Sequence, residues 1–392
     1  MKIVCISAAH IPSDTANSIQ VMKACQAFVQ LGHAVTLLVP EEQRLAVSGQ
    51  RLAARSQPSA DNGQWSAVNN QQSKISNQQL ADHYGLQSLF PIQWLPSTNR
   101  RLFPWKAVWQ ARRLGADLLY VWPLQSAALG LLAGIPTLLE LHDLPTGAGP
   151  LWLRLFVMLP GHKRLLPISR ALQRRLRLPQ EYTVTAPDGV DLERYASLPD
   201  PADARHILGL PEAVTVLCTG HLYAGRGADL FLGLAAKFPR VSFVWVGGRP
   251  VDVETWKARA AGLANLTFTG FVSNQRIPLY QSAAEILLMP YQRTVATSSG
   301  GNTAEFCSPM KMFEYMAAGR AILSSDLPVL HEVLDDSLAV FCPPDDSCAW
   351  ESALGELLAD EKRRQALGRS VRSAVGQYSW LRRAQRVLDG FQ

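Results

Sequence analysis

Residues 308–324 have the sequence SPMKMFEYMAAGRAILS, which predicts a short helix followed at once by a strand. Ser308 is a favoured N-cap residue, Pro309 suits the first helical position, and the residues after them are good helix formers. Gly319 predicts a left-handed C-terminal stop, and the run 321–324 predicts a buried strand. A helix that leads directly into a buried strand is typical of α/β domains with parallel sheets.

The N-terminus of this helix is suited to bind a phosphate group. Its first turn leaves backbone N–H groups without helical partners and adds partial positive charge, and Lys311 contributes a full charge beside them. Glu314 lies further along the helix, where its carboxylate could accept hydrogen bonds from two vicinal hydroxyls, such as those of a ribose. An ordinary capped helix that binds nothing is the alternative.

Length and composition predict two or three well-filled globular domains, because the chain has 392 residues, 47% of them hydrophobic and 18% charged. The formal net charge is +6, and between residues 100 and 177 twelve Lys and Arg face only three Asp and Glu. The six cysteines form no Cys-x-x-Cys pair, and no His or Cys cluster has zinc spacing. We expect reduced thiols and a cytoplasmic location, since nothing after Met1 resembles a signal peptide.

A charge-free run of 22 residues, 118–139, has the length of a membrane span. Pro123, Gln125 and Pro136 interrupt it. We therefore expect a strand, a helix and a strand of a buried parallel unit at 118–122, 124–133 and 137–141.

Periodicity along the chain predicts two α/β units. The first begins with a strand, a helix and a strand at 2–7, 18–31 and 34–39. Residues 41–80, rich in Gln, Ser, Asn and Arg, predict a flexible surface insertion. The second unit has candidate strands at 214–218, 241–246, 266–269, 285–289, 321–324 and 339–342. Because ligands bind at the carboxyl ends of such strands, the loops after residues 141, 218, 246 and 289 should meet in one cleft.

The stretch 308–328 resembles the donor-site helix of retaining glycosyltransferases of the GT-B fold, in the large family called glycosyl transferases group 1, or family 4. The resemblance covers nearly the whole chain except the insertion. It implies an α/β protein of two Rossmann-like doubly wound domains facing a cleft. Residues 1–187 would be the acceptor-side domain, residues 188–377 the nucleotide-sugar-binding domain, and residues 378–392 a helix that crosses back to the first domain.

The resemblance also implies roles for individual residues. The glutamate at the position of Glu314 binds the ribose in that family, and the first turn around Ser308, Met310 and Lys311 faces the phosphates. The loop 219–227, TGHLYAGRG, matches the segment that supplies two bases to the pyrophosphate. Arg226 fits the second base, whereas His221 stands where an arginine is common. The glycines of this loop, Gly220 among them, would let the backbone approach the ligand.

Three further segments match the family. Residues 139–143, LELHD, resemble the Glu-x-His segment whose histidine, His142 here, contacts hydroxyls of the donor sugar. In the loop 10–18, Ala16 and Asn17 occupy the place of paired glycines beneath the phosphate and sugar. Residues 270–274, which include Val272, match the segment that meets the base through main-chain contacts. A structural histidine at 142 and a bystander at His221 are the alternatives.

One family feature is altered in this chain. Two glutamates separated by seven residues form the family signature, but Phe306 stands eight positions before Glu314 and Glu305 one position too early. Either a bulge at Cys307 lets Glu305 reach the sugar, or the loop 298–303, with Gly300 and Gly301, does so through its backbone. We favour the loop.

The activity implied by the resemblance is a hexosyltransferase that retains the anomeric configuration. It would move a hexosyl unit from a nucleoside-diphosphate sugar to a hydroxyl acceptor, such as a glycolipid or a precursor of a cell-surface polysaccharide or exopolysaccharide. His142, Arg226, Lys311 and Glu314 would be the catalytic residues, with stabilisation of the departing phosphate as the main effect. No metal or other cofactor is implied, since the Asp pairs at 335 and 345 lack Asp-x-Asp spacing.

Two alternatives remain within this fold. Phe306 and His221 favour a catalytically silent sugar-nucleotide-binding or scaffold protein. An epimerase would need acid and base carboxylates in the cleft that the sequence does not locate. A nicotinamide dehydrogenase is disfavoured because no Gly-x-Gly-x-x-Gly follows the first strand.

Residues 151–177 combine aromatic and aliphatic side chains with arginines, as in the segment LWLRLFVML at 151–159. Such a surface suits an anionic membrane, so we expect peripheral attachment to the inner face of a membrane and a lipid-linked or glycan acceptor. A core helix flanked by solvated arginines is the alternative. No recognised module accompanies the charge, so nucleic acid is not expected to bind.

Overall fold

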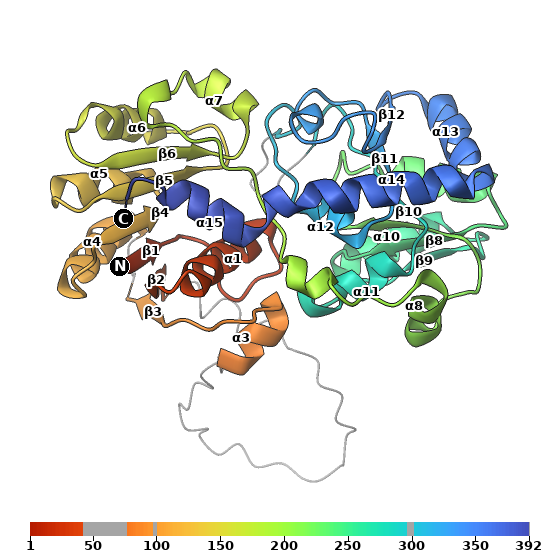
Figure 1. The fold of residues 1–392 in the computed structure, drawn as a ribbon, viewed down its shortest axis with the longest axis horizontal. Helices are drawn as coiled ribbons and strands as arrows, with labels where there is room; N and C mark the ends of the chain where they lie inside the picture. The colour runs from red at the N-terminus through yellow and green to blue at the C-terminus, as the bar shows by residue number, and fades with distance from the viewer. Residues whose placement is uncertain (42–76, 97–99, 296–301, 392) are drawn as a thin grey trace, which may run out of the picture.

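The computed structural model describes residues 1–41, 77–96, 100–295 and 302–391. It contains two α/β domains side by side, each with a parallel sheet of six described strands (Figure 1). Most of the expected insertion, residues 42–76, lies outside the described residues, as do Gly300 and Gly301.

The N-terminal sheet has the strand order β3-β2-β1-β4-β5-β6. Its strands are β1 (Lys2–Ile6), β2 (Ala34–Pro40), β3 (Ile92–Leu95), β4 (Leu118–Val121), β5 (Thr137–Leu141) and β6 (Lys163–Pro167). The helices of this domain are α1 (Ala16–Gln30), α3 (Asn77–Tyr84), α4 (Phe103–Arg113), α5 (Leu124–Leu132), α6 (Gly149–Met158) and α7 (Arg170–Leu176), with short 3-10 turns η1 (Arg100–Leu102) and η2 (Gln180–Tyr182).

Both faces of this sheet are covered, which explains its nearly continuous apolar strands. In β1, Ile3 and Cys5 pack on the side of α1, whereas Val4 and Ile6 pack on the side of α4, α5 and α6. The charge-free run 118–139 forms β4, α5 and most of β5, as the sequence predicted. Of the helices that the structure describes, none combines the length and apolar character that a membrane crossing requires.

The C-terminal sheet has the strand order β12-β11-β10-β7-β8-β9. Its strands are β7 (Thr215–Thr219), β8 (Ser242–Val246), β9 (Leu266–Phe268), β10 (Ile286–Met289), β11 (Ala321–Ser325) and β12 (Val340–Cys342). The helices are α8 (Pro201–Leu208), α9 (Ala228–Lys237), α10 (Pro250–Arg259), α11 (Ile277–Ser282), α12 (Met310–Ala318), α13 (Ser347–Ala359) and α14 (Glu361–Ala374), with 3-10 turns η3 (Leu192–Tyr195), η4 (Asn274–Arg276), η5 (Leu330–Glu332) and η6 (Val375–Tyr378). Two doubly wound Rossmann-like domains, the predicted fold class, are thereby confirmed.

The sequence did not predict β3 and α3. β3 is a four-residue edge strand whose side chains are all half-buried, so it lacks both the alternation and the apolar run that identify strands. Residues 77–80, the last four of the predicted insertion, form the first half of α3 instead.

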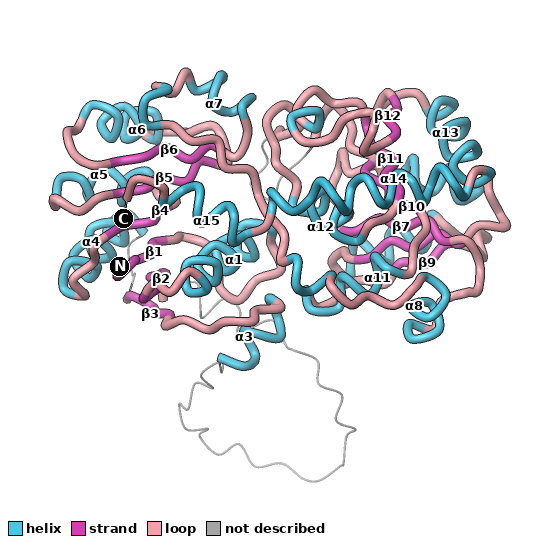
Figure 2. Tube along the Cα trace, viewed as in Figure 1, coloured by secondary structure: helices cyan, strands magenta, loops and turns pink. Residues whose placement is uncertain are grey.

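The chain crosses between the domains twice, and the two crossings lie side by side (Figure 2). The N–H of Val190 donates to the carbonyl of Tyr378 (3.0 Å), and the N–H of Trp380 donates back to Val190 (3.2 Å). Gly189 fits there because a Cβ would lie 2.9 Å from the nitrogen of Trp380. After the second crossing, α15 (Trp380–Leu388) packs against α1 of the N-terminal domain.

A buried ion pair joins α1 to the first crossing. The Nζ of Lys23 contacts the carboxylate of Asp191 and donates to the carbonyl of Gly85 (2.7 Å), while Gln26 donates to the other carboxylate oxygen (3.1 Å). Burial lowers the pKa of Lys23 to about 8, and the neighbouring Asp191 limits that fall. The N-terminal domain is thus tied to the linker by charge as well as by the backbone.

The glycines of the loop 219–227 serve the packing of the C-terminal domain. Gly225 and Gly227 both have φ of +81°, and a Cβ on either would overlap the carbonyl oxygen of Thr294 or Pro290. The expectation that these two glycines admit a ligand was wrong, because segments distant in the sequence fill that space. Gly220 does face the interdomain side, where a Cβ would lie 3.4 Å from the Nζ of Lys311.

We predict that Gly227→Ala destabilises the C-terminal domain by at least about 2 kcal/mol, through the left-handed backbone and the overlap with Pro290. Gly233→Ala is the control, since Gly233 lies within α9, the helix that Gly227 precedes as N-cap, and nothing lies within 4 Å of the added Cβ. It should stabilise the protein slightly. Urea unfolding of both variants measures the difference, and equal stabilities would contradict the packing described.

Candidate functional site

A cavity of about 540 Å³ lies between the two domains at the carboxyl ends of their strands. The loops after β5, β7, β8 and β10 contribute to its lining, as the sequence predicted, together with the N-terminal ends of α1 and α12. The cavity brings together ten of the residues expected from the sequence: Asn17, His142, Gly220, His221, Arg226, Val272, Ser308, Met310, Lys311 and Glu314.

The N-terminal end of α12 reaches the cavity, but Ser308 does not cap it. The helix begins at Met310 with Pro309 as the N-cap residue, and no side chain bonds its first turn. The extended backbone of Pro309 moves Ser308 outside the helix, where its Oγ accepts a hydrogen bond from the N–H of Asp188 (3.0 Å). Gly319 ends the helix in the left-handed conformation, as predicted.

Two cations converge at the cavity wall. The Nη1 of Arg226, from the loop after β7, donates to the hydroxyl of Tyr291 (3.0 Å). The Arg226 guanidinium and the Nζ of Lys311 lie 5.2 and 5.1 Å from the centre of the Tyr291 ring. The Nε of Arg226 is buried without a partner among the residues that the structure describes. Two adjacent positive charges with aromatic contacts attract an anion with several oxygens, such as a pyrophosphate.

Glu314 lies on α12 beside these cations. The Nε2 of Gln281 donates to its Oε2 (3.2 Å). Burial raises the pKa of the Glu314 carboxyl, against the opposing effects of Arg194, Gln281, Lys23 and Lys311. A buried carboxylate in a cavity wall gains from hydroxyl donors that a ligand brings.

His142 follows β5 on the opposite wall. Its Nε2 lies 2.9 Å from Oε1 of Glu140, which is completely buried, and a quarter of the His142 side chain remains exposed. Asn17 is exposed in the first turn of α1 and also borders the cavity. The N-terminal domain therefore presents the imidazole of His142 and the amide of Asn17, among other groups, to any ligand held by the C-terminal domain.

Contacts made by two histidines join the domains at the cavity. The ring of His221 stacks on Tyr223 (4.9 Å, 15°), and its Nε2 donates to the carbonyl of Asp14 (3.2 Å). His83 of α3 stacks on Phe271 (5.8 Å, 22°), which is followed by the predicted base-contacting Val272. His221 is thus engaged in a contact between the domains, and His83 is a wall residue that sequence reasoning missed.

Glu305 does not line the cavity, where one alternative had it contact the sugar. Its carboxylate pairs with Arg175 of α7, and its side chain is 60% exposed. The side chain of Phe306 is buried in the core of the N-terminal domain, where the Phe306 carbonyl accepts a hydrogen bond from Ser169 (2.8 Å). The structure therefore disfavours the Glu305 alternative. In the favoured loop, Thr303 borders the cavity, while Gly300 and Gly301 lie outside the described residues.

Asp188 and Tyr291 are cavity residues that the sequence did not single out as site residues. Asp188 lies in the first crossing between the domains, and its Oδ1 is buried with no partner in the described structure. Burial raises the pKa of Asp188 to about 6, against the opposing effects of His142 and Arg383. Tyr291 has no local sequence signal, because its contacts with Arg226 and Lys311 form only in the folded chain.

No group of three or more His, Cys, Asp or Glu side chains in the described chain has the arrangement of metal ligands.

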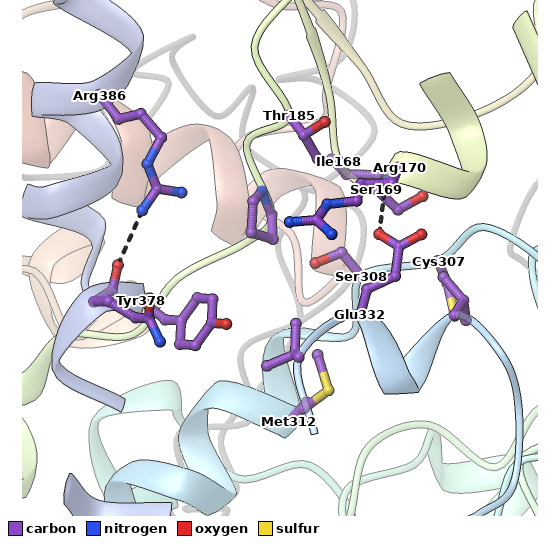
Figure 3. Close-up of a pocket in the computed structure, with 14 residues that line it drawn as sticks. Ile168, Ser169, Arg170, Thr185, Cys307, Ser308, Met312, Glu332, Tyr378 and Arg386 are labelled. Carbon is purple, nitrogen blue, oxygen red and sulfur yellow. Dashed lines mark hydrogen bonds between the residues drawn. The ribbon is translucent and has the colours of Figure 1, made fainter. Parts of the chain in front are cut away.

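A second cavity, of about 260 Å³, lies behind the wall formed by Ile168, Cys307 and Ser308 (Figure 3). Both interdomain crossings border it, at 185–187 and 377–378. The carboxylate of Glu332 already binds the first N–H groups of α7, at Arg170 (2.6 Å) and Ala171 (2.7 Å). We therefore take the larger cavity as the candidate site and regard this one as a space beside the two crossings.

Comparison with protein families finds a match in the C-terminal domain. Residues 213–360 match the family model described as glycosyl transferases group 1. The GDP-mannose-dependent alpha-(1-6)-phosphatidylinositol monomannoside mannosyltransferase of Mycolicibacterium smegmatis is 28% identical over 213 residues, 52% of this chain and 54% of that protein. The D-inositol 3-phosphate glycosyltransferase of Xylanimonas cellulosilytica is 29% identical over 218 residues, 52% of this chain and 49% of that protein. The chain thus spans about half the length of these curated relatives.

Solved structures match the whole chain. Anabaena HepE in complex with UDP has a TM-score of 0.70 at 15% identity, covering 100% of this chain and 99% of that one. A glycosyltransferase from Rickettsia africae has a TM-score of 0.70 at 10% identity, covering 100% of this chain and 98% of that one. Similarity at such identities shows the fold alone, and that fold is GT-B.

We predict that Asp188→Asn makes the protein more stable than the unchanged protein at pH 7 but not at pH 4. The folded pKa of about 6 exceeds the unfolded value, so the stability that Asp188 contributes is complete below about pH 4 and is lost as the pH rises through 6. The gain at pH 7 should be on the order of 2–3 kcal/mol.

Melting curves at pH 4 and 7 test this prediction. Asp345→Asn is a control of opposite sign, because a hydrogen bond from Arg293 lowers the pKa of the exposed Asp345 and that residue stabilises the fold at neutral pH. A pH-independent effect of Asp188→Asn would show that the carboxyl titrates normally.

Proposed function

We propose that this chain, whose C-terminal domain is a glycosyl transferases group 1 domain in a GT-B fold, transfers a hexosyl unit from a nucleoside-diphosphate sugar to a hydroxyl acceptor with retention of configuration. The observation that carries the proposal is the convergence of Arg226 and Lys311 on Tyr291, with Glu314 on the same helix as Lys311. These groups match the pyrophosphate and ribose of one donor.

The donor would lie across the C-terminal side of the cavity. Its pyrophosphate would contact Arg226, Lys311 and the first turn of α12, where the helix dipole adds positive charge. Its ribose hydroxyls would donate to Glu314, and its base would lie near Val272 and Phe271. One relative is named as GDP-mannose-dependent and one similar structure is a complex with UDP, so both nucleotides are candidates.

The reaction would exchange one C–O bond for another. The bond from the anomeric carbon to the nucleotide phosphate breaks, and the acceptor hydroxyl forms the new bond from the same face. The hydroxyl proton passes to an oxygen of the departing phosphate. Arg226 and Lys311 would stabilise the charge that grows on that phosphate, and His142 would hold hydroxyls of the sugar.

For the acceptor we propose a glycolipid or another lipid-linked or surface-polysaccharide precursor, met by peripheral attachment to an anionic membrane. The predicted segment 151–177 includes α6, where Leu151 and Met158 are each 70% exposed. In the same layer of helices, α4 exposes Trp105 and Trp109 at 59% and 60%. Such apolar side chains beside Lys and Arg suit a membrane interface.

Helix α7 contributes less to this surface than the sequence implied. Arg175 and Arg174 pair with Glu305 and Glu332 of the C-terminal domain, so part of the positive charge of α7 is compensated there. The membrane-facing surface is therefore proposed for α4 and α6, with Lys106, Arg112, Arg113 and Arg154 as its basic residues.

A protein that binds sugar nucleotides without transferring the sugar is the second candidate. The position of Phe306 favours it, because that side chain is buried in the N-terminal core where relatives would have a glutamate in the cleft. Formation of a glycosylated product distinguishes the two candidates.

We predict that a UDP-, GDP- or ADP-sugar raises the melting temperature of the protein and that Glu314→Ala removes most of this rise. Loss of hydrogen bonds to a charged carboxylate should weaken nucleotide binding about 10- to 100-fold. Glu254→Ala, an exposed residue of α10, is the control and should bind normally. Thermal shift against a panel of these sugars is the measurement, and no shift with any of them contradicts the proposal.

We predict that the protein floats with vesicles containing anionic lipid and that the combined changes Trp105→Ala and Trp109→Ala weaken this binding. Raising the salt concentration should weaken it further, since part of the attraction is electrostatic. Ile207→Ala with Val251→Ala is the control, because these apolar residues of the C-terminal domain are similarly exposed, at 60% and 67%. Equal binding to neutral and anionic vesicles would contradict the proposed membrane-facing surface.

A further inference from the structure

Arg383 of α15 is buried where the terminal helix meets the N-terminal domain and the linker, with 3% of the residue exposed. Its Nη1 donates to the hydroxyl of Tyr120 (2.8 Å), and its Nη2 contacts the carboxylate of Glu140. Nη2 also donates to the carbonyl of Ala186 (3.0 Å), and Nε donates to that of Pro187 (2.9 Å). One side chain of the last helix therefore holds the linker, β4 and β5 together.

Glu140 is the residue through which this contact reaches the cavity. Its Oε2 accepts from Tyr120, and its Oε1 accepts from Gln20 (3.1 Å) and lies 2.9 Å from Nε2 of His142. Burial opposes ionisation of Glu140, but the charge of Arg383 and the bonds from His142 and Tyr120 outweigh it and lower the pKa. The buried carboxylate stays ionised because Arg383 lies beside it.

The ionised carboxylate fixes one property of His142. A carboxylate can only accept hydrogen bonds, so the Nε2 of His142 carries a proton and donates it to Glu140. The neutral imidazole then has its lone pair on Nδ1, the nitrogen that remains for other partners. The hydrogen bond to Glu140 therefore sets both the orientation and the tautomer of His142, which borders the cavity.

We propose that Arg383 is a positioning residue of the candidate site, which acts through Glu140 to hold the His142 imidazole in one orientation and one tautomer. The C-terminal helix then forms part of the catalytic apparatus. Only one part of this proposal rests on the proposed function: the contact between His142 and hydroxyls of the donor sugar. The competing explanation is that Arg383 is purely structural: it joins α15 to the N-terminal domain and has no effect on the orientation or tautomer of His142.

The charged and titratable groups linked to His142, directly or through Glu140, come from the strand that precedes it and from three other parts of the chain. They are Glu140 of β5, Asp188 in the linker, Tyr120 of β4 and Arg383 of α15. Asp188 interacts electrostatically with both His142 and Arg383, so Asp188→Asn is included as a reference that removes this charge and leaves the contact between Glu140 and His142 in place.

The decisive variants are Arg383→Lys and Arg383→Gln. Arg382→Gln is the matched control, because Arg382 is the adjacent residue of α15 but is exposed at its side chain, with a 3.5 Å contact to Gln385. A lysine keeps the charge but cannot reach all the acceptors that the guanidinium contacts. We expect kcat to fall about 10- to 100-fold in both Arg383 variants with little change in the donor KM, the size of effect known for lost carboxylate partners of metal-bound histidines.

A double-mutant cycle separates the two explanations. In the His142→Ala background, Arg383→Lys should cost little further activity, because its effect passes through the imidazole. An equal fold-loss with and without His142 would overturn the proposal and favour the purely structural role.

Nitrogen-15 NMR of the histidine side chains gives a readout that needs no activity. Neutral His142 should show the Nε2–H tautomer in the unchanged protein and in Arg382→Gln and Asp188→Asn, and a mixture in Arg383→Gln. If the Arg383 variants do not fold, Tyr120→Phe removes one bond to Glu140 and should shift the tautomer in the same direction. An unchanged tautomer in the folded variants overturns the inference. Absence of transfer by the unchanged protein would instead reject the proposed function and leave the tautomer result valid.

Discussion

The buried ion pair between Arg383 and Glu140 is the constraint on which the arrangement of the two domains depends. The pair lies in the N-terminal domain, but Arg383 follows the entire C-terminal domain in the sequence. The end of the chain must therefore pack back on the N-terminal domain before the pair can form. A buried carboxylate without its cation is strongly unfavourable, so the terminal helix must dock for this domain to be complete. The second buried pair, Lys23 with Asp191, fixes the first crossing in the same way. Both crossings are thereby held by charge, and the cavity between the domains has defined walls.

Four cations near the crossings and the cavity fall into two groups with different partners. Lys23 and Arg383 face carboxylates and stabilise the fold. Arg226 and Lys311 form no ion pair with a carboxylate in the described structure, and their contacts are Tyr291 and Cys218. Positive charges that a protein leaves uncompensated in a cleft form a preorganised site for an anion, because little reorganisation is needed when it binds. This contrast explains why the proposed nucleotide site lies where it does.

The sequence revealed the elements whose signals are local, and it failed where the partner is distant. Four strands of the C-terminal sheet, β7, β8, β10 and β11, are buried on both faces and form largely apolar runs, which is why they were predicted. β3 was missed because a short edge strand carries no such run. The roles of Gly225 and Gly227 were misjudged because the carbonyls that exclude a side chain come from residues 290 and 294. Arg383 could not be found at all, since 243 positions separate it from Glu140.

The segment just before α12 couples that helix to the other domain. Within four residues, Glu305 pairs with Arg175, Phe306 enters the N-terminal core, and Ser308 accepts the N–H of Asp188. The start of α12 is therefore positioned by contacts with the N-terminal domain and the linker as well as by its own sheet. Since Lys311 and Glu314 project from that helix, a change in the angle between the domains would move the proposed phosphate and ribose contacts together. Phe306, which stands where the resemblance led us to look for a glutamate, thus has a structural role: it anchors the segment before α12 in the core of the N-terminal domain.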